Sequence, residues 1–200
     1  REPKAGARGC ALGVGMQVTN IAGDVGEDAR AGGLYLPTDW RDEGGVDSAE
    51  VLANPGATPE IRAMVRRLLA EADRLYHRSE AGVKGLPIAA RPGIFAARHC
   101  YDAIGRKLAR GGYDSISTRA FTTRGQKMRL LGWSVIRAGL VTTFPQSPVI
   151  YARPLPEVAF LVEAAAHPSS AKTGWSDNVL AVLSQLEARD RSDGGLARGA

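Results

Sequence analysis

The sequence predicts an all-α fold. Apolar residues recur every three to four positions in several long segments, which is the period of a helix with one buried face. No segment of useful length alternates between apolar and polar residues as a half-buried strand would, and there is no nucleotide-binding glycine loop. With 200 residues, of which 44% are hydrophobic and 24% charged, the chain is long enough to form one domain with a sizeable core.

The first predicted helix covers about residues 6–30. It ends at Gly32 and Gly33, because glycine directly after a helical run is a common C-terminal signal. Residues 34–37 are expected to form a loop. A further short helix is expected to begin at Thr38, beside an aspartate that suits a first helical turn.

Three longer helices are expected further along the chain. The first has the clearest start, with Thr58 as the N-cap, Pro59 at the first helical position and Glu60 in the first turn. Its apolar residues keep the helical period as far as Tyr76. Two other helices are predicted over about residues 92–110 and 123–140.

The C-terminal part has a different composition. Residues 143–191 contain a proline-rich linker, and short helices are expected within them at about 157–166 and 177–189, the latter capped by Ser176. Residues 192–200 are polar and glycine-rich, so we expect them to be disordered. The predicted organisation is therefore a helical domain over residues 1–142, a linker with short helices, and a tail.

Charge and cysteine content narrow the function classes. The net charge of +5 suits an anionic substrate or an anionic membrane surface, and equally a solvated arginine-rich exterior. Two cysteines imply no disulfide framework, so we expect a reducing, cytoplasmic setting, with peripheral contact to the inner membrane left open. Aromatic residues are only 6% of the chain and no known nucleic-acid module is visible, so we expect no nucleic-acid partner.

An acidic stripe lies on the first predicted helix. Gln17, Asn20, Asp24, Glu27 and Asp28 share one face at the helical spacing. Carboxylates held this close repel one another, so a fold that points them into a cavity needs a cation there. Mg²⁺ fits such oxygen ligands, with Mn²⁺ as the alternative. The plainer interpretation is a solvated acidic face, which is the commoner outcome for two aspartates on a helix.

Glycines on the same helix favour a site over a solvated face. Gly13, Gly15, Gly23 and Gly26 each cost about 1 kcal/mol of helix stability relative to alanine. A helix that keeps four of them is expected to be approached closely by a neighbouring element or by a ligand.

The acidic stripe lies within a recognisable motif. Residues 16–28, MQVTNIAGDVGED, followed by AGGLYLP at 31–37, resemble the second aspartate-rich motif of the squalene/phytoene synthase family, and most closely its bacterial phytoene synthase branch. Weaker blocks follow in the family's order: AEADRLY at 70–76, GLP at 85–87, AARHCYDAI at 96–104, GYD at 112–114 and TTRGQK at 122–127. The likeness covers about residues 10–131 and fades beyond about residue 142.

The resemblance implies the all-helical isoprenoid synthase fold. It also implies an earlier aspartate-rich motif in an upstream half of the protein, and this chain shows no counterpart. We therefore expect the chain to be the C-terminal portion of a synthase, a fragment or a natural truncation lacking its N-terminal half. On that expectation the chain alone makes no phytoene.

The activity that the resemblance implies is the head-to-head joining of two geranylgeranyl diphosphates to give phytoene in carotenoid biosynthesis. The alternatives are a squalene or dehydrosqualene synthase acting on farnesyl diphosphate, and a non-catalytic helical protein that keeps the fold as a remnant or a partner. The length of the prenyl chain is set by the depth of the cavity, which the sequence does not give.

The resemblance also assigns roles to residues of the stripe. Asp24 and Asp28 match the two aspartates of the motif and are the expected catalytic and metal-binding residues. Asn20 matches an amide that helps to hold the metal or the diphosphate, and Gln17 an amide that faces the diphosphate. Glu27 is expected to turn away from the cavity.

The resemblance also bears on two tyrosines and two glycines. Tyr35 stands where the family often has a tyrosine near the diphosphate, and Tyr101 matches a tyrosine at the substrate pocket, although its helical spacing equally fits a core residue. Gly23 stands where the family usually has an arginine, and Gly33 where it tends to have a basic residue. Both departures remove positive charge from the expected diphosphate site.

Overall fold

The computed structural model describes residues 3–143 and 155–166, and those residues contain helices and no strand, which confirms the predicted all-α class. The chain divides into the units Arg1–Ala166 and His167–Ala200, and all described residues belong to the first. The α-helices are α1 Pro3–Arg30, α2 Thr38–Glu43, α3 Ser48–Ala53, α4 Pro59–Glu80, α5 Arg91–Arg110, α6 Arg124–Thr143 and α7 Ala159–Ala166. Short 3₁₀ turns lie at η1 Val83–Gly85, η2 Ile88–Ala90 and η4 Pro156–Val158.

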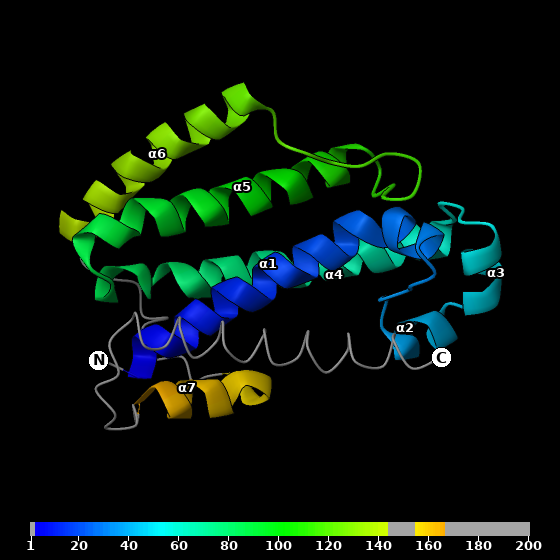
Figure 1. Cartoon of the computed structure of the whole chain (residues 1–200), viewed down its shortest axis with the longest axis horizontal. Helices are drawn as coiled ribbons and strands as arrows, with labels where there is room; N and C mark the ends of the chain where they lie inside the picture. The colour runs from blue at the N-terminus through cyan, green and yellow to red at the C-terminus, as the bar shows by residue number, and fades with distance from the viewer. Residues whose placement is uncertain (1–2, 144–154, 167–200) are drawn as a thin grey trace, which may run out of the picture. The chain divides into compact units, whose positions relative to one another are not determined.

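Three long helices form the centre of the fold. Helix α1 packs along α4, both contact α5, and α6 lies against α5 on its other side (Figure 1). Helix α7 packs on α1. The main core joins small residues of α1 to larger ones of α4, namely Ala22, Val25, Ala29, Ile61, Val65 and Leu68. Small residues on α1 allow the two helix axes to approach closely, which holds the acidic face of α1 on a rigid support.

The helix ends follow their sequence signals. Helix α1 ends before Gly32, which has a φ of +85° that a residue with a side chain rarely adopts. The N–H of Gly33 then donates to the carbonyl of Asp28 at 2.8 Å. Helix α4 begins at Pro59 after Thr58, whose hydroxyl accepts the N–H of Ile61 at 3.4 Å, so the predicted N-cap is confirmed.

The short helices and the C-terminal part agree with the sequence predictions only in part. Helix α3 was not expected, because six residues are too few to show a helical period; its cap is Asp47, whose carboxylate accepts the N–H of Ala49 at 2.9 Å. The helix expected at 157–166 is present as η4 and α7. The helix expected at 177–189 and the tail at 192–200 lie outside the described residues.

No helix in the described part of the chain is both long enough and apolar enough to cross a bilayer.

Candidate functional site

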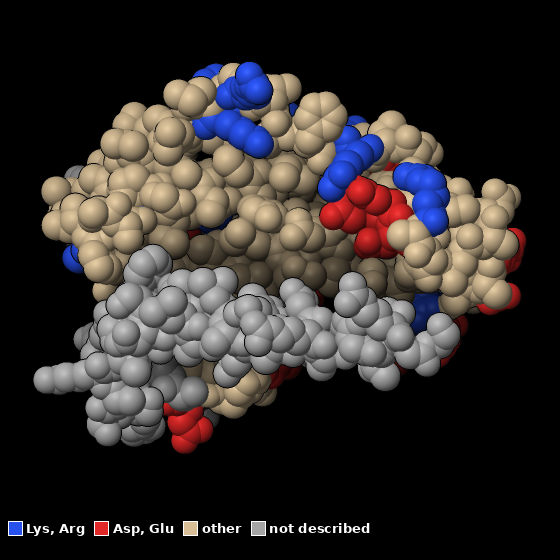
Figure 2. Space-filling view, in the orientation of Figure 1, with Lys and Arg blue, Asp and Glu red and all other residues tan. Residues whose placement is uncertain are grey.

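The helical spacing brings the three acids of the stripe together. Asp24 and Asp28 are half-buried and Glu27 is exposed, near the C-terminal end of α1. Figure 2 shows acidic side chains gathered over this end of α1, with basic side chains beside them. Burial, followed by repulsion from Asp24 and Glu27, raises the pKa of Asp28 above its ordinary value. A cation or a hydrogen-bond donor placed there would favour the ionised form.

One arginine, Arg119, contacts two of these acids. Its guanidinium lies 3.3 Å from a carboxylate oxygen of Asp24 and 2.7 Å from one of Glu27. Arg119 belongs to the segment between α5 and α6 and was not among the site residues predicted from the sequence. No local pattern marks it, because only the path of that segment brings the side chain to α1. The acidic face therefore has a positive group beside it, although Gly23 and Gly33 supply none.

The segment that carries Arg119 is fixed by Asp114. The carboxylate of Asp114 accepts the N–H groups of Ile116 at 3.1 Å and Ser117 at 2.8 Å, and pairs with Arg62 of α4 at 2.9 Å. Burial alone would raise the pKa of Asp114, but these hydrogen bonds and the charge of Arg62 outweigh it and hold the pKa below its ordinary value. Asp114 thus ties the segment to α4 in its ionised form.

The same segment lies directly on α1 at Gly26. The N–H of Gly26 is 3.2 Å from the carbonyl oxygen of Ser115, and a Cβ at this position would be 2.6 Å from the Cα of Ile116. Arg30 adds a hydrogen bond to the carbonyl of Ile116 at 3.3 Å. The close approach expected from the glycines of this helix is therefore real at Gly26, where the neighbour is backbone.

The four glycines differ in their surroundings. A Cβ at Gly15 would meet the Tyr76 ring at 3.0 Å, so this position also faces a close neighbour. A Cβ at Gly13 or Gly23 would meet nothing within 4 Å. Of the four, only Gly15 and Gly26 therefore meet a close neighbour, and Gly23, although buried, has space for a Cβ.

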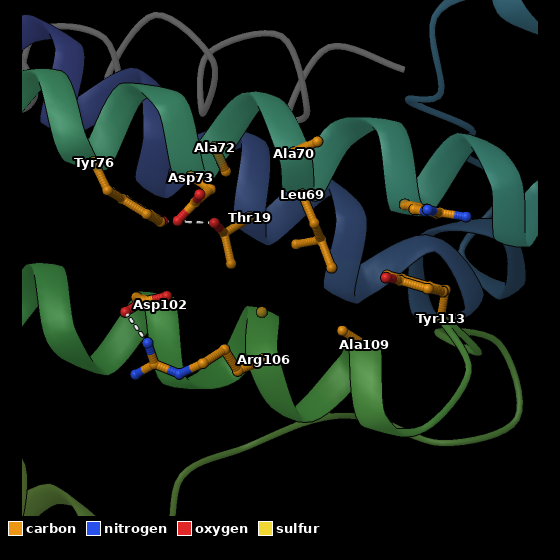
Figure 3. A pocket seen from close by; sticks show the side chains of 12 residues that line it. Thr19, Leu69, Ala70, Ala72, Asp73, Tyr76, Asp102, Arg106, Ala109 and Tyr113 are labelled. Carbon is orange, nitrogen blue, oxygen red and sulfur yellow. Dashed lines mark hydrogen bonds and ion pairs between the residues drawn. The ribbon is translucent and has the colours of Figure 1, made fainter.

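A cavity of about 250 Å³ opens between α1, α4 and α5 (Figure 3). Its lining combines small apolar side chains with groups that can donate or accept hydrogen bonds: Thr19, Arg66, Leu69, Ala70, Ala72, Asp73, Tyr76, Asp102, Gly105, Arg106, Ala109 and Tyr113. Asp73 comes from α4, whereas Asp102 and Arg106 come from α5, where they form an ion pair at 2.5 Å. Polar groups therefore lie on both sides of an otherwise apolar space.

A hydroxyl pair closes the cavity on the side of α1. The hydroxyls of Thr19 and Tyr76 are 2.5 Å apart, and each is within hydrogen-bond distance of the Gly15 carbonyl, at 3.0 and 2.9 Å. Burial raises the pKa of Tyr76 to about 12, so the phenol stays neutral and acts as a hydrogen-bond donor. Helical spacing indicated only a core position for Tyr76, and the partner hydroxyl of Thr19 could not be identified from it.

Helix α1 and the segment between α5 and α6 contribute residues both to the cavity and to the acidic face. Asn20, which is half-buried, directly follows Thr19 on α1, and Tyr113 lines the cavity from the same segment that carries Arg119. Gln17 is exposed, further towards the N-terminus of α1. The structure therefore places Asn20, Asp24 and Asp28 on the helix that forms one wall of the cavity.

The two predicted tyrosines lie elsewhere. Tyr35 is 65% exposed, and its ring is close to Gly33 rather than in the lining of the cavity. Tyr101 is half-buried against a small cluster that contains Leu12 and Tyr76, and its neighbour Asp102 reaches the cavity. The substrate-binding roles of both tyrosines remain predictions.

The acids do not form a complete metal cage. Within residues 3–143 and 155–166, no group of three or more His, Cys, Asp or Glu side chains is arranged so that it could hold a metal ion. Asp24, Asp28 and Asn20 could supply part of a coordination shell, and the remaining oxygens would come from water or from a bound phosphate. Mg²⁺ is commonly held in this way, by one or two carboxylates together with substrate oxygens.

Comparison with known proteins assigns the chain to a family. The family model described as squalene/phytoene synthase matches residues 1–126, which include α1 and the segment that carries Arg119. The chain belongs to the squalene/phytoene synthase family. Its helical structure is that expected of the family's isoprenoid synthase fold, and the resemblance seen at residues 16–37 is confirmed.

Individual relatives extend the match. The chain is 56% identical to a phytoene synthase of Cereibacter sphaeroides over 191 residues, which is 96% of this chain and 54% of that protein. It is 50% identical to a phytoene synthase of Rhodobacter capsulatus, again over 96% of this chain and 56% of the relative. A 15-cis-phytoene synthase of a Paracoccus species is 38% identical over 66% of this chain and 43% of its own length. The chain thus spans about half the length of the first two relatives.

Gly23 offers a direct test of the local packing in this family member. Because an added Cβ meets no atom within 4 Å, Gly23→Ala should raise the free energy of unfolding by up to about 1 kcal/mol through helix propensity. Gly23→Arg should add to this a positive group beside the acids, and should tighten binding of inorganic diphosphate. Urea unfolding and calorimetric titration measure the two effects. A loss of stability in both variants would show that the helix needs a glycine here.

The ionised carboxylate of Asp28 should lower the stability of the fold at neutral pH. A carboxyl whose pKa is raised on folding is penalised when ionised, so its cost to stability is present at neutral pH and disappears as the pH falls through the raised pKa. Asp28→Asn should therefore raise the free energy of unfolding at neutral pH, by no more than about 1 kcal/mol for this partly solvated group. Near the ordinary aspartate pKa the difference from wild type should shrink. A variant less stable than wild type at neutral pH would contradict this expectation.

Proposed function

We propose that this chain supplies the diphosphate and metal side of a prenyltransferase that joins two geranylgeranyl diphosphates head to head into phytoene. The observation that carries the proposal is the face of α1 on which Asp24 and Asp28 lie, with Arg119 paired to Asp24 at 3.3 Å and a largely apolar cavity that the same helix lines through Thr19. Kinship with the phytoene synthases of Cereibacter sphaeroides and Rhodobacter capsulatus supports the choice of product.

The residues of this face fit a magnesium ion. Asp24, Asp28 and Asn20 offer hard oxygen donors, and the raised pKa of Asp28 reflects negative charge that a cation would compensate. When bound, Mg²⁺ would neutralise charge on the diphosphate oxygens. Arg119 is 62% exposed, so its side chain is able to move aside when such an ion binds to the acids.

Each group of the site then has a task. Departure of one diphosphate builds negative charge, and the guanidinium of Arg119 can hold that charge through paired hydrogen bonds. This task would otherwise belong to the arginine that the family usually has at Gly23. The exchange requires Arg119 to leave Glu27 or Asp24 when the diphosphate arrives, and its exposure permits that movement.

The cavity provides the second requirement of the reaction. A prenyl cation is quenched by water, so it must form next to apolar walls. Leu69, Ala72 and Ala109 supply such walls, and the hydroxyls of Thr19 and Tyr76 satisfy each other and the Gly15 carbonyl, which leaves them little tendency to recruit water. Asp73 and Asp102, on the opposite helices, are the acids available to a second diphosphate and its cation.

A chimeric enzyme tests this function. The matching segment of the Cereibacter sphaeroides phytoene synthase is replaced by this chain, and products are analysed after addition of C15 or C20 diphosphates with Mg²⁺. We expect phytoene from the C20 substrate. Formation of squalene or dehydrosqualene from the C15 substrate would point instead to the alternative enzyme class. A folded chimera that forms no product, beside an active parent, would identify the chain as a non-catalytic member of the family.

A further inference from the structure

The guanidinium of Arg62 on α4 joins three parts of the chain. Its Nε donates to the carbonyl of Ala57, before α4, at 2.9 Å, and its Nη1 donates to the carbonyl of Gly112, after α5, at 2.9 Å. Its Nη2 pairs with the carboxylate of Asp114, also at 2.9 Å. A planar guanidinium keeps its donors in a fixed geometry, so these three bonds fix their acceptors relative to α4. We call Arg62 with these three acceptors the Arg62 clamp.

The clamp holds a turn in an uncommon backbone conformation. Gly112 has a φ of +70° and Tyr113 a φ of +60°, and Tyr113 is the one residue other than glycine with a positive φ in the described part of the chain. Their N–H groups donate to the last turn of α5, to the carbonyls of Ala109 at 3.1 Å and Leu108 at 3.0 Å. A side chain is rarely found in this conformation, which persists only where the surroundings hold it. A Cβ on Gly112 would lie 3.2 Å from Nη1 of Arg62, so turn and guanidinium are in close contact.

The turn reverses the direction of the chain and brings the next segment back onto α1. Figure 1 shows the segment between α5 and α6 beside the C-terminal end of α1, where the carbonyl of Ser115 accepts the N–H of Gly26 at 3.2 Å. Arg119 lies four residues beyond Ser115, and from there its guanidinium reaches the acidic face. The clamp on α4 therefore determines where the backbone that carries Arg119 lies.

We infer that Arg62 is a positioning residue for diphosphate binding at the acidic face of α1, because it holds the segment from which Arg119 reaches that ligand. The inference rests on the proposed function, which assigns the diphosphate to this face. The side chain of Arg119 is 62% exposed and loses conformational freedom when it binds. A fixed backbone beneath it keeps that loss small, so the clamp strengthens binding without touching the ligand.

Two substitutions of opposite charge separate positioning from simple attraction. Arg62→Gln removes a positive charge and Asp114→Asn removes a negative one, and each breaks the same ion pair. Attraction alone predicts that the first weakens the binding of an anion and that the second tightens it. We expect both variants to bind inorganic diphosphate with Mg²⁺ about tenfold more weakly than wild type, as loss of a group behind a ligand contact commonly does. Calorimetric titration of the chain measures these affinities.

An exposed ion pair on the same helix supplies matched controls. Arg74 and Glu71 of α4 are 2.5 Å apart, and both are well exposed. Arg74→Gln and Glu71→Gln remove the same two charges and should each leave the affinity for diphosphate within about twofold of wild type. Circular dichroism at the temperature of the titration confirms that every variant is folded.

A double-mutant cycle tests whether Arg62 acts through Arg119. Arg119→Gln should weaken diphosphate binding by itself, and adding Arg62→Gln should then change the affinity by less than about twofold, because the group that the clamp positions is already absent. A general loss of structure would weaken binding by the same factor in both backgrounds. Amide hydrogen exchange without ligand should also be faster at Ile116 and Ser117 in Arg62→Gln, since their N–H groups donate to the carboxylate that Arg62 holds.

The possible results separate this inference from the proposed function. Unchanged affinity in Arg62→Gln, tighter binding by Asp114→Asn, additive effects in the cycle, or unchanged exchange at Ile116 and Ser117 would each overturn the inference and leave the proposed function in place. A wild-type chain that binds no diphosphate in the presence of Mg²⁺ would contradict the proposed function, and the inference would fall with it.

Discussion

Asp24→Asn should lower phytoene formation by the chimera by on the order of 100-fold or more. The substitution keeps the size and most of the hydrogen bonding of the side chain but removes a charge that would hold Mg²⁺ beside the departing diphosphate. Loss of one group that stabilises developing charge typically costs on the order of 10²–10³ in rate. Turnover is measured with geranylgeranyl diphosphate at saturating Mg²⁺.

Glu27→Gln is the matched control for this experiment. It removes the same charge, one turn away on the same helix, and from a residue that contacts the same Arg119 at 2.7 Å. Since Glu27 is exposed and is expected to face away from the cavity, its loss should reduce turnover by less than about tenfold. If the two variants lost activity equally, the effect would come from Arg119 or from net charge, and Asp24 would not be a metal ligand.

Gly26→Ala should be the most destabilising of the glycine substitutions on α1. The added Cβ would lie 2.6 Å from the Ile116 Cα and 2.7 Å from the Ile116 carbonyl oxygen, and backbone cannot turn aside as a flexible side chain can. Overpacking of this kind usually costs about 1–3 kcal/mol, and it should more than cancel the gain in helix propensity. Urea unfolding of the chain measures the change.

Gly23→Ala, three residues earlier on the same helix, separates the two contributions. Both substitutions make the same gain in helix propensity, but only the one at Gly26 meets a neighbour. We expect the two variants to differ by about 2 kcal/mol or more, with Gly26→Ala the less stable. Equal stability would mean that the segment at Ser115 and Ile116 does not rest on α1, and the position of Arg119 would then lose its support.

The local features of this fold were predictable because their causes are local. A threonine before a proline marks the start of α4, a glycine at positive φ marks the end of α1, and a spacing of three or four residues places Asp24, Glu27 and Asp28 on one face. The acidic motif also identified the family. These signals lie within a few residues of the feature that they determine.

The features that were missed depend on contacts between distant parts of the chain. Arg119 reaches Asp24 only because Asp114 fixes the intervening segment to Arg62 and Gly26 lets it lie against α1. The helical period places Tyr76 on the buried face of α4, but it does not show that its hydroxyl pairs with that of Thr19. The exposure of large apolar residues on α6, such as Trp133 and Ile136, was likewise not predicted, because periodicity shows that residues share a face and not what covers that face.

Other parts of the predicted site remain predictions. Asn20 lies on the same helix as Asp24 and Asp28 and is half-buried, but no contact of its side chain tests a role in binding metal or diphosphate. Gln17 and Tyr35 are exposed, so any contact with substrate would have to form when the substrate binds. Substitution of each residue in the chimera, read as the change in KM against the change in kcat, would distinguish binding from catalysis.

The central claim is that the acidic face of α1 binds a prenyl diphosphate through a divalent cation. Calorimetric titration with a thiolodiphosphate analogue of geranylgeranyl diphosphate, which resists ionisation, tests it most directly. We predict saturable binding by the chain in the presence of Mg²⁺, none with a chelator, and none when Asp24→Asn and Asp28→Asn are combined. Equal affinity in the double variant, or binding that ignores Mg²⁺, would contradict the account and place the diphosphate elsewhere.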